Sequence, residues 1–238
     1  MKILHVVHQY APDFVGGTEL YTAKLAKEQA MRGASVAVFV PVPRTASASS
    51  ASVKGPVVEA VSEDGVMVYR VFVGDRSAGR VFADQVFGSA VIVTAFQQVL
   101  AEFMPDMVHI QHLMGVSTAV VTRLQEKKIP YVVTLHDYWY GCANAQLLTN
   151  TDHVVCDGPD RVFVNCGRCA LARANLPSFG LFGMAVAPLM AYRQRRLRTV
   201  LAGAQAVIAP THFVQQIYAE MGLSTNTRPA ERSPTKTR

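Results

Sequence analysis

The sequence predicts an α/β fold in which a parallel sheet is flanked by helices and one segment carries a cysteine-rich insertion. Short apolar runs of strand length alternate with amphipathic helical stretches along most of the 238 residues. Half of the residues are hydrophobic, which is enough for a sizeable core in one α/β domain. All four cysteines fall between Cys142 and Cys169, so the insertion is confined to one part of the chain.

The start of the chain reads as a βαβ unit. Residues 2–10, KILHVVHQY, and residues 35–41, SVAVFVP, both have the pattern of buried strands. Between them we expect a helix that begins near Thr18, a residue type that caps helices, and ends near Gly33. A strand, a crossover helix and a second strand predict parallel pairing in one sheet.

Further strand and helix patterns follow this unit. We expect strands at 66–73, 107–111, 130–137 and 204–210, and helices at 79–104, 115–128, 211–222 and in a basic stretch after residue 175. The serine- and alanine-rich residues 44–55 read as a mobile loop. Residues 224–238 have no apolar period and read as a disordered tail.

The formal charge of +6 is concentrated in two segments, a basic helix pattern and the tail, so we expect no nucleic-acid-binding surface. The helix pattern contributes four arginines: Arg193, Arg195, Arg196 and Arg198. They follow the apolar segment Leu176–Tyr192, and they read either as a solvated helix face or as a docking strip for an anionic membrane surface.

Two glycines and two prolines interrupt that apolar segment, and no run reaches the roughly 18 uncharged apolar residues of a spanning helix. The chain opens directly into a strand pattern at Lys2 rather than into a secretory signal. We therefore expect a cytoplasmic protein, peripheral at the inner face of the membrane if the basic strip docks there.

Polar residues follow several of the predicted strands. Gly16 and Gly17 come after the first strand, His112 after the strand at 107–111, and His136 and Asp137 after the strand pattern YVVTL. Because ligands of open α/β sheets bind outside the carboxyl ends of the strands, we expect these residues to form one polar rim.

The glycine pair predicts an anion site. Backbone amides of Gly16 and Gly17 can approach a phosphate closely, and a helix that starts at Thr18 adds its positive end. Glu19 in the first turn is either a partner of that helix dipole or part of the site. A flexible loop with two glycines is the plain alternative. The dinucleotide fingerprint G-x-G-x-x-G is missing, so we expect no NAD.

The histidine that follows the strand YVVTL is the main catalytic candidate. His136 can donate a hydrogen bond to a sugar hydroxyl or to charge that develops on a leaving group. Asp137 orients a hydroxyl or caps the loop, and His112 is a weaker candidate for the same rim. A packed, structural role stays open for each. Three further histidines read as buried inside strands: His5, His8 and His109.

The insertion has the ligand types of a structural metal site. Its four cysteines are Cys142, Cys156, Cys166 and Cys169, and the last two form a Cys-x-x-Cys pair. Four thiolates in a chain without an export signal fit a structural zinc ion that closes a loop with little core of its own. Free thiols, a disulfide pair or an iron–sulfur cluster remain alternatives.

Four segments together resemble one known family. They are YAPDFVGGTELYTAKLAKEQAMRGASVAVF, PDMVHIQH, VVTLHDYWYGC and AVIAPTHFVQQIYAEMGL. In order and spacing they are similar to the amino-terminal domain of family 4 glycosyltransferases, which are retaining enzymes of the two-lobed GT-B fold. The resemblance implies a Rossmann-like amino-terminal lobe over residues 1–223. This lobe includes a cysteine-rich insertion at 138–175, as in a subset of the family.

The resemblance also implies roles for particular residues. Gly16 and Gly17 match the loop that meets the donor phosphates and shapes the acceptor site, and Thr18, Glu19 and His112 belong to the same rim. His136 matches the histidine that reaches the donor sugar near the reacting carbon, with Asp137 beside it. The implied co-substrate is a nucleotide-sugar, and the implied acceptor is a sugar or lipid-linked glycan of cell-envelope polysaccharide biosynthesis.

The sequence departs from the family in two places. The segment Cys142-Ala143-Asn144 stands where the family usually reads Cys-Pro-Arg, which affects a local acceptor contact. The family's carboxy-terminal lobe, which binds most of the nucleotide, has no counterpart in these residues. We therefore expect the acceptor-side lobe of a retaining glycosyltransferase, truncated or paired with a separate donor lobe, and inactive alone. The alternatives are a non-catalytic module that binds a glycolipid or membrane surface, and a metal-binding interaction protein.

Overall fold

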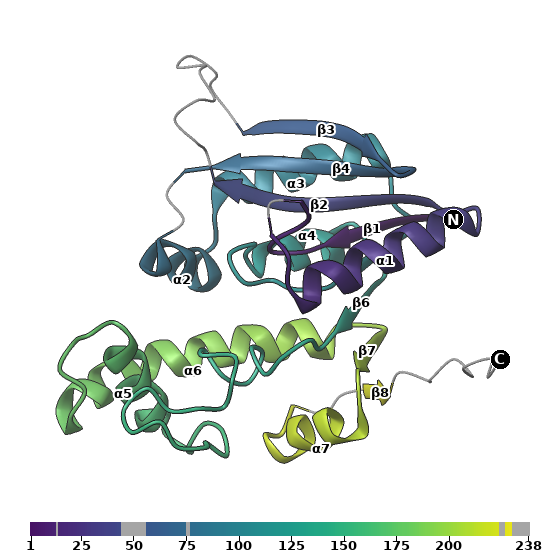
Figure 1. The fold of residues 1–238 in the computed structure, drawn as a ribbon. Helices are drawn as coiled ribbons and strands as arrows, with labels where there is room; N and C mark the ends of the chain where they lie inside the picture. Colours follow the sequence, from purple (N-terminus) through teal and green to yellow (C-terminus); the bar gives the residue numbers. More distant parts are fainter. Residues whose placement is uncertain (13, 44–55, 75–76, 224–226, 230–238) are drawn as a thin grey trace. The chain divides into compact units, whose positions relative to one another are not determined.

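The computed structural model describes residues 1–12, 14–43, 56–74, 77–223 and 227–229 (Figure 1). This part of the chain falls into two compact units, Met1–Val133 and Thr134–Arg238. The loop predicted at 44–55 and most of the predicted tail lie outside the described residues.

The first unit is a mostly parallel sheet flanked by helices. Its strands are β1 (Lys2–Val6), β2 (Ser35–Pro43), β3 (Val57–Glu63), β4 (Val66–Val73), β5 (Met107–Ile110) and β6 (Tyr131–Thr134). Its helices are α1 (Gly17–Met31), α2 (Ala78–Phe87), α3 (Ala90–Phe103) and α4 (Ala119–Glu126). The strand order is β3-β4-β2-β1-β5-β6, and only the β3–β4 pair is antiparallel. The parallel α/β architecture predicted from the sequence is therefore confirmed.

The central strands of this sheet are buried on both faces. Val36 to Val42 of β2 are all buried, as expected for a parallel strand with a near-continuous apolar run. Helix α1 covers one face, and its Ala26 packs in a cluster with Val38, Val40 and Val68. This buried core supports the edge of the sheet at which β1 and β5 have their carboxyl ends.

Strand β3 was absent from the sequence prediction. It pairs with β4 through a tight hairpin in which Asp64 and Gly65 both have positive φ, 50° and 80°. Asp-Gly is a strong signal for such a turn, because glycine adopts positive φ without cost and aspartate tolerates it. No residue of Val57–Glu63 is fully buried, which fits a strand at the edge of the sheet.

Several predicted boundaries shift in the structure. Strand β1 ends at Val6, so His8 lies beyond the strand and the prediction that it sits inside one was wrong. Helix α1 begins at Gly17 with Gly16 as its N-cap, so Thr18 is in the first turn and is not the cap. The helix predicted at 79–104 is broken at Gly88, where a φ of 91° cannot continue a helix.

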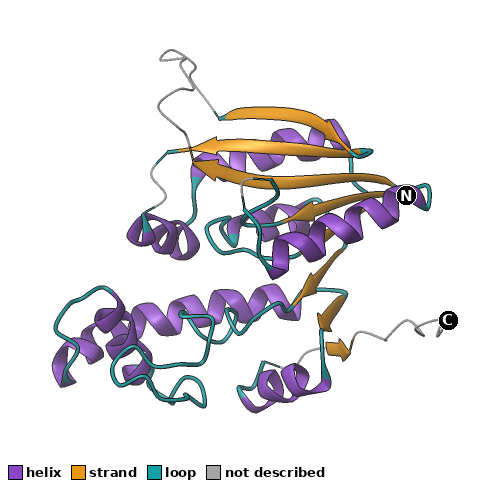
Figure 2. Ribbon diagram, viewed as in Figure 1, coloured by secondary structure: helices purple, strands orange, loops and turns teal. Residues whose placement is uncertain are grey.

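The second unit is dominated by helices and long loops (Figure 2). Its elements are α5 (Val164–Arg173), α6 (Gly180–Ala202), β7 (Ala206–Ala209), α7 (His212–Glu220) and β8 (Thr227–Pro229). The predicted cap of α7 is confirmed, since the Thr211 hydroxyl accepts a hydrogen bond from the amide of Val214. The predicted disorder of residues 224–238 was wrong for Thr227–Pro229. These residues pair with β7, because backbone pairing to a free strand edge requires no apolar pattern.

Helices α5 and α6 pack at backbone distance. A Cβ on Gly167 would collide with the carbonyl oxygen of Gly183, so the two glycines allow the helices to touch directly. In the described part of the chain, no single helix is long and apolar enough to cross a membrane. Only the segments Gly79–Phe87 and Ala90–Phe103 taken together, bent by 62°, reach that length and composition.

Candidate functional site

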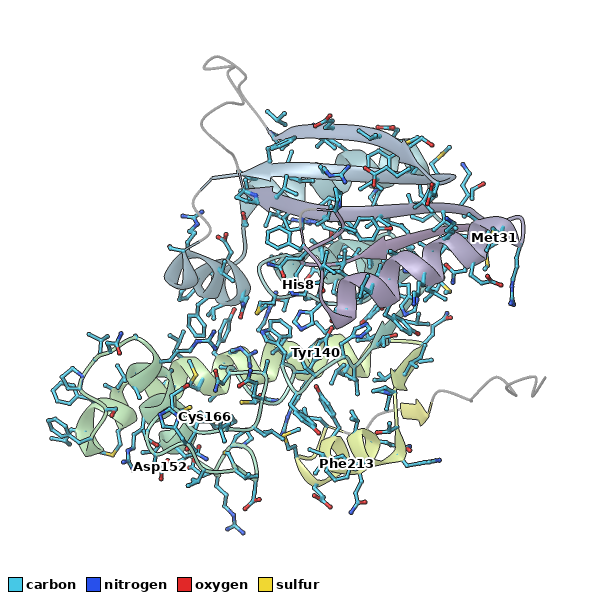
Figure 3. All side chains as sticks on the ribbon, viewed as in Figure 1. His8, Met31, Tyr140, Asp152, Cys166 and Phe213 are labelled. Carbon is cyan, nitrogen blue, oxygen red and sulfur yellow. The ribbon has the colours of Figure 1, made fainter. Side chains whose placement is uncertain are left out.

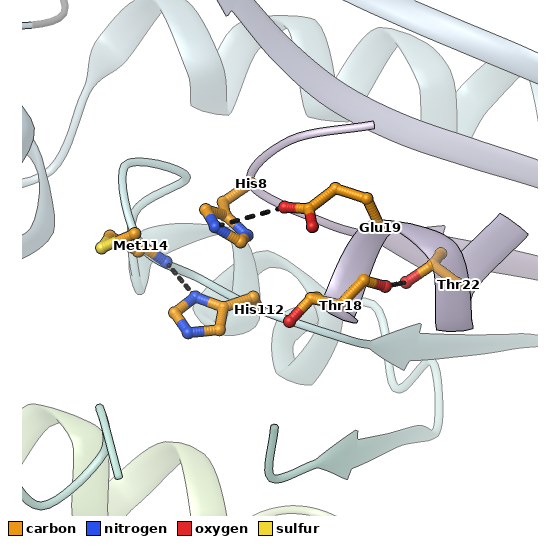
Figure 4. Close-up of polar contacts among 6 residues, drawn as sticks. All are labelled: His8, Thr18, Glu19, Thr22, His112 and Met114. Carbon is orange, nitrogen blue, oxygen red and sulfur yellow. Dashed lines mark hydrogen bonds and ion pairs between the residues drawn. The ribbon is translucent and has the colours of Figure 1, made fainter. Parts of the chain in front are cut away.

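A buried polar cluster lies at the carboxyl edge of the first unit's sheet (Figure 4). His8 follows β1, His112 follows β5, and Glu19 comes from the first turn of α1. The Nε2 atom of His8 is 3.7 Å from Oε1 of Glu19, and the rings of His8 and His112 are in contact, with centroids 4.4 Å apart and a tilt of 40° between their planes. All three residues are at most 8% exposed. Two neighbouring parallel strands and one helix therefore bring a carboxylate and two imidazoles together.

The backbone fixes the orientation of His112. The amide of Met114 donates a 3.0 Å hydrogen bond to its Nδ1, so the neutral ring carries its proton on Nε2. The ring therefore presents one defined donor. His112, Glu19, Gly16 and Gly17 were predicted to share a rim, and the structure brings them together.

The two glycines have different roles. Gly16 is extended, with φ −140° and ψ −176°, which any residue adopts. A Cβ at this position would lie 2.5 Å from Oε2 of Glu19, so a side chain here would require the carboxylate to shift. A Cβ on Gly17 would meet nothing within 4 Å. Gly17 is thus an open position at the positive end of α1, where an anion can approach the first-turn amides.

A third buried histidine, His5, lies within strand β1. His5 bonds through Nε2 to Oε1 of Gln29 at 2.8 Å and through Nδ1 to Nε2 of Gln111 at 3.1 Å. One neutral tautomer satisfies both bonds, because Nε2–H donates to the amide oxygen and Nδ1 accepts from the amide nitrogen. Burial lowers the pKa of His5 to about 4, although the bond to Gln29 opposes this. His5 is a neutral core residue, as predicted.

The predicted catalytic pair lies in the second unit. His136 and Asp137 are half-buried and follow β6 directly. Oδ1 of Asp137 accepts a 2.8 Å hydrogen bond from the amide of Trp139, so this carboxylate caps its own loop. The hydroxyl of Tyr218 donates a 2.7 Å bond to the carbonyl of Asp137. Helix α7 thereby anchors the backbone at Asp137, the residue next to His136.

Helix α6 holds the next residues of the same loop. Arg193 donates a 2.7 Å bond to the carbonyl of Trp139 and lies over its indole ring, with 4.9 Å from the guanidinium carbon to the ring centroid. Gln194 donates to the carbonyl of Tyr140 at 3.0 Å. Arg193 is only 3% exposed, so the predicted membrane-docking strip was wrong for this residue. Its pKa is lowered by burial to about 10, so it stays cationic at neutral pH.

The four cysteines are free thiols, each partly buried. Cys142 follows the loop just described, Cys156 follows a bridge between Leu148 and Val155, and Cys166 and Cys169 lie three residues apart on α5. Cys166 is labelled in Figure 3. Burial first, and the other three thiols next, raise the pKa of Cys166 to about 12. Within the described ranges, no three His, Cys, Asp or Glu side chains are grouped so that they could hold a metal ion. The arrangement of the four cysteines therefore does not show the predicted zinc site.

Sequence reasoning missed two residues of these sites, His8 and Arg193. For His8 the available signal was the typical length of a strand. Strand β1 has five residues and ends at Val6, before His8. The signal for Arg193 was helical spacing. Met190, Arg193 and Leu197 recur at three- and four-residue intervals, which places the arginine on the apolar face of α6.

Known structures share this fold. Sucrose-phosphate synthase from Thermosynechococcus elongatus is 14% identical, with a TM-score of 0.54 over 96% of this chain and 47% of that one. The structure described as trehalose-6-phosphate from E. coli bound with UDP-2-fluoro glucose is 9% identical, with a TM-score of 0.50 over 96% of this chain and 48% of that one. The chain thus spans about half the length of the structures it matches.

No curated protein matches the chain. The family described as the glycosyl transferase 4-like domain matches residues 16–230, which is most of the sequence and includes the glycine pair, His112, His136 and the cysteine insertion. The chain therefore belongs to the glycosyl transferase 4-like domain family.

Proposed function

We propose that this chain is the acceptor-side lobe of a retaining glycosyltransferase, which moves a sugar from a nucleotide-sugar donor to a sugar or lipid-linked acceptor. The observation that carries the proposal is the buried cluster of Glu19, His8 and His112 beside the open amino end of α1. Burying a carboxylate and two imidazoles costs free energy, and such groups are concentrated at functional sites.

The roles of the first-unit residues follow from their chemistry. The amides at Gly17 and the dipole of α1 stabilise the negative charge of the donor diphosphate. The Nε2–H of His112 is a donor for a hydroxyl or a phosphate oxygen. Glu19 accepts hydrogen bonds from acceptor hydroxyls or fixes His8, with which it pairs.

The second-unit pair acts on the sugar. His136 donates a hydrogen bond near the reacting carbon, where charge develops as the bond to the leaving diphosphate breaks. Asp137 keeps this histidine in place through its bond to Trp139, and Tyr218 anchors the same backbone from α7. Asp137 is therefore a positioning residue in this proposal.

A second lobe supplies most of the binding energy for the donor. The chain spans about half the length of the solved structures of the same fold, one of which is bound with UDP-2-fluoro glucose. Without a donor lobe, whether on the same or another polypeptide, the reacting groups are not held in place and turnover is very low.

The test is calorimetric titration of residues 1–238 with a panel of nucleotide-sugars, with and without a donor lobe supplied in trans. We expect transfer only with the added lobe, and its loss in H136A but not in H153Q, a change at an exposed histidine. If a folded chain shows neither binding nor transfer with any lobe tested, the catalytic proposal is wrong.

A second candidate, binding to an anionic membrane surface, is supported by an apolar surface between α5 and α6. We define this tip by five exposed side chains: Leu176, Phe179, Leu181, Phe182 and Met184. Between Asp160 and Glu220 the chain has seven arginines and no acidic residue. Exposed aromatic and aliphatic side chains in a basic segment suit the interface of an anionic bilayer. This proposal would place the chain at the inner face of the membrane.

Vesicle flotation separates the two candidates. We expect binding to vesicles that contain phosphatidylglycerol, weaker binding to phosphatidylcholine alone, and a loss of binding in the double variant F179S/F182S. F213S is the control, because Phe213 is about as exposed as Phe179 but lies on α7. Equal behaviour of the two variants would count against the tip.

A further inference from the structure

The backbone on both sides of His136 is anchored within the second unit. The amide of Leu135 donates a 2.8 Å hydrogen bond to the carbonyl of Ile208 on β7. The carbonyl of Asp137 accepts the 2.7 Å bond from the Tyr218 hydroxyl on α7. The histidine therefore stands between two peptide groups that a strand and a helix hold in place.

The loop that follows closes on itself at Tyr138. The amides of Gly141 and Cys142 donate to the carbonyl of Tyr138 at 2.9 and 2.7 Å, and the amide of Tyr138 donates to the carbonyl of Ala145 at 3.0 Å. These bonds form a tight turn, which places the peptide groups of the next two residues in the interior. The carbonyls of those residues need donors from elsewhere in the chain.

Two adjacent residues of α6 supply these donors. Arg193 bonds to the carbonyl of Trp139 at 2.7 Å, and Gln194 bonds to the carbonyl of Tyr140 at 3.0 Å. All four residues are at most 3% exposed. With these two bonds, each carbonyl from residue 137 to residue 140 accepts a hydrogen bond. The loop after His136 is thus fixed along its whole backbone.

Arg193 is a costly choice for holding a carbonyl. Burying a guanidinium removes it from water, and within the described residues the buried Nε of Arg193 has no hydrogen-bond partner. An apolar side chain of similar volume avoids both losses and often leaves a protein as stable or more stable. Departures from the rules of stable packing are expected where a residue serves function.

The guanidinium does two things that other side chains do not combine. Its Nη2 donates to the carbonyl of Trp139, while its planar group lies 4.9 Å from the centre of the indole ring. The backbone and the side chain of Trp139 are therefore fixed by one residue. A lysine can donate to the carbonyl but has no planar face, and a methionine can fill the space but cannot donate.

We propose that Arg193 is a positioning residue for His136, and that it fixes the catalytic loop through Trp139 before any substrate binds. Asp137 is the link between them, because its carboxylate accepts from the amide of Trp139 and its carbonyl is held by Tyr218. A displaced Trp139 releases that carboxylate, and with it the backbone beside His136. This inference rests on the proposed function, since His136 needs a fixed place if it acts on a sugar.

The first measurement follows the loop without any substrate. Trp139 is the only tryptophan of the chain, so tryptophan fluorescence reports on this loop alone. We expect weak quenching by acrylamide in the unmodified chain, clearly stronger quenching in R193M, and an intermediate value in R193K. R32Q is the control, because it removes an arginine that is 76% exposed on α1, and its quenching should match that of the unmodified chain.

Hydrogen exchange of the unmodified chain tests the same point without a variant. The amides of Tyr138 and Trp139 should exchange as slowly as those in the middle of α6, because both are bonded inside a fixed loop. Rapid exchange of these two amides beside a protected α6 would show that the loop is not held, and would overturn the inference even if R193M and R193K do not fold.

Transfer kinetics with the donor lobe supplied in trans then test the effect on His136. We expect R193M to lower kcat by about 10- to 100-fold with the KM for the nucleotide-sugar unchanged, since small displacements of reacting groups cost about this much. R193K should recover part of the loss. The rates are compared at a temperature at which circular dichroism shows every variant to be folded, so a loss of stability does not lower them.

Each outcome decides a separate point. A folded R193M with full kcat, or with an altered KM and unchanged kcat, would overturn the positioning role. An equal loss in R193K and R193M, without a change in quenching, would do the same, because the loop would then be in place. If the unmodified chain transfers no sugar with any lobe, the proposed function fails, and fluorescence and exchange still decide whether Arg193 fixes the loop.

Discussion

The carboxylate of Glu19 occupies the space that a side chain on Gly16 would need. Its Oε2 lies 2.5 Å from the position of a Cβ on residue 16, while the other oxygen faces His8. The glycine that precedes α1 is thus explained by the seating of one buried acid rather than by its own dihedral angles.

This relationship predicts opposite results for the two glycines. G16A must shift the Glu19 carboxylate beside His8, and because this carboxylate is the end of a flexible side chain the loss of stability should be about 1 kcal/mol, at the lower end of overpacking effects. G17A has open space and lies in a helix, so it should be neutral or stabilise by up to about 1 kcal/mol. Thermal unfolding measures both. Because Gly17 is also the proposed approach for a phosphate, G17A should still weaken binding of a nucleotide-sugar.

The pKa of His5 predicts a loss of stability in mild acid. The value is about 4 in the folded protein and 6.5 in the unfolded chain, so the unfolded state binds more protons between these values. The contribution of neutral His5 is complete above pH 6.5 and falls as the pH drops toward 4, by about 3 kcal/mol in total.

Two measurements check the prediction for His5. The ring protons of His5 in an NMR titration should not shift above pH 5. Urea unfolding should show a steeper loss of stability in acid for the unmodified chain than for H5Q. The control H153Q, at an exposed position, should keep the steep dependence. A His5 ring that titrates near pH 6.5 would contradict its burial in the folded state.

The contact between α5 and α6 predicts that G167A is strongly destabilising. The new methyl group would meet the carbonyl oxygen of Gly183, which is backbone and cannot rotate away, so the helices must separate. We expect a loss of about 3 kcal/mol or more, at the upper end of overpacking effects. G180A, with no atom within 4 Å of its new Cβ, is the matched control in the same unfolding assay.

The bond from Tyr218 to Asp137 predicts a modest but specific effect. Y218F removes a buried 2.7 Å hydrogen bond, which should cost about 1 kcal/mol and free the backbone next to His136. Hydrogen exchange of the Asp137 and Tyr138 amides should therefore accelerate. Y192F, on the exposed side of α6, should leave both stability and exchange unchanged. Equal exchange in the two variants would show that Tyr218 does not hold this loop.

Local patterns determined the framework of this protein. Apolar strand runs and amphipathic helices were enough to predict a parallel α/β sheet. A central parallel strand is buried on both faces, so its own residues form a recognisable apolar run. The Thr211 cap and the helix ends near Gly33 and Gly222 could also be predicted from local sequence. Caps and positive φ angles depend on only one or two residues. The rim positions of Gly16 and His112 followed from their places after predicted strands, and Glu19 was added to the rim by the family resemblance.

Contacts between distant residues were decided only by the tertiary structure. His8 joins Glu19 and His112 because β1 ends two residues before it, and strand ends depend on the pairing partner. The arginine run read as a solvated face or a docking strip. In the structure Arg193 is buried, because it contacts both the carbonyl and the ring of Trp139, which lies 54 residues away in the chain. The short strand β8 forms on the edge of β7 without an apolar pattern. Helical spacing can place Arg193 on the apolar face of α6, but local sequence does not identify Trp139 as its partner, because the two residues are far apart along the chain.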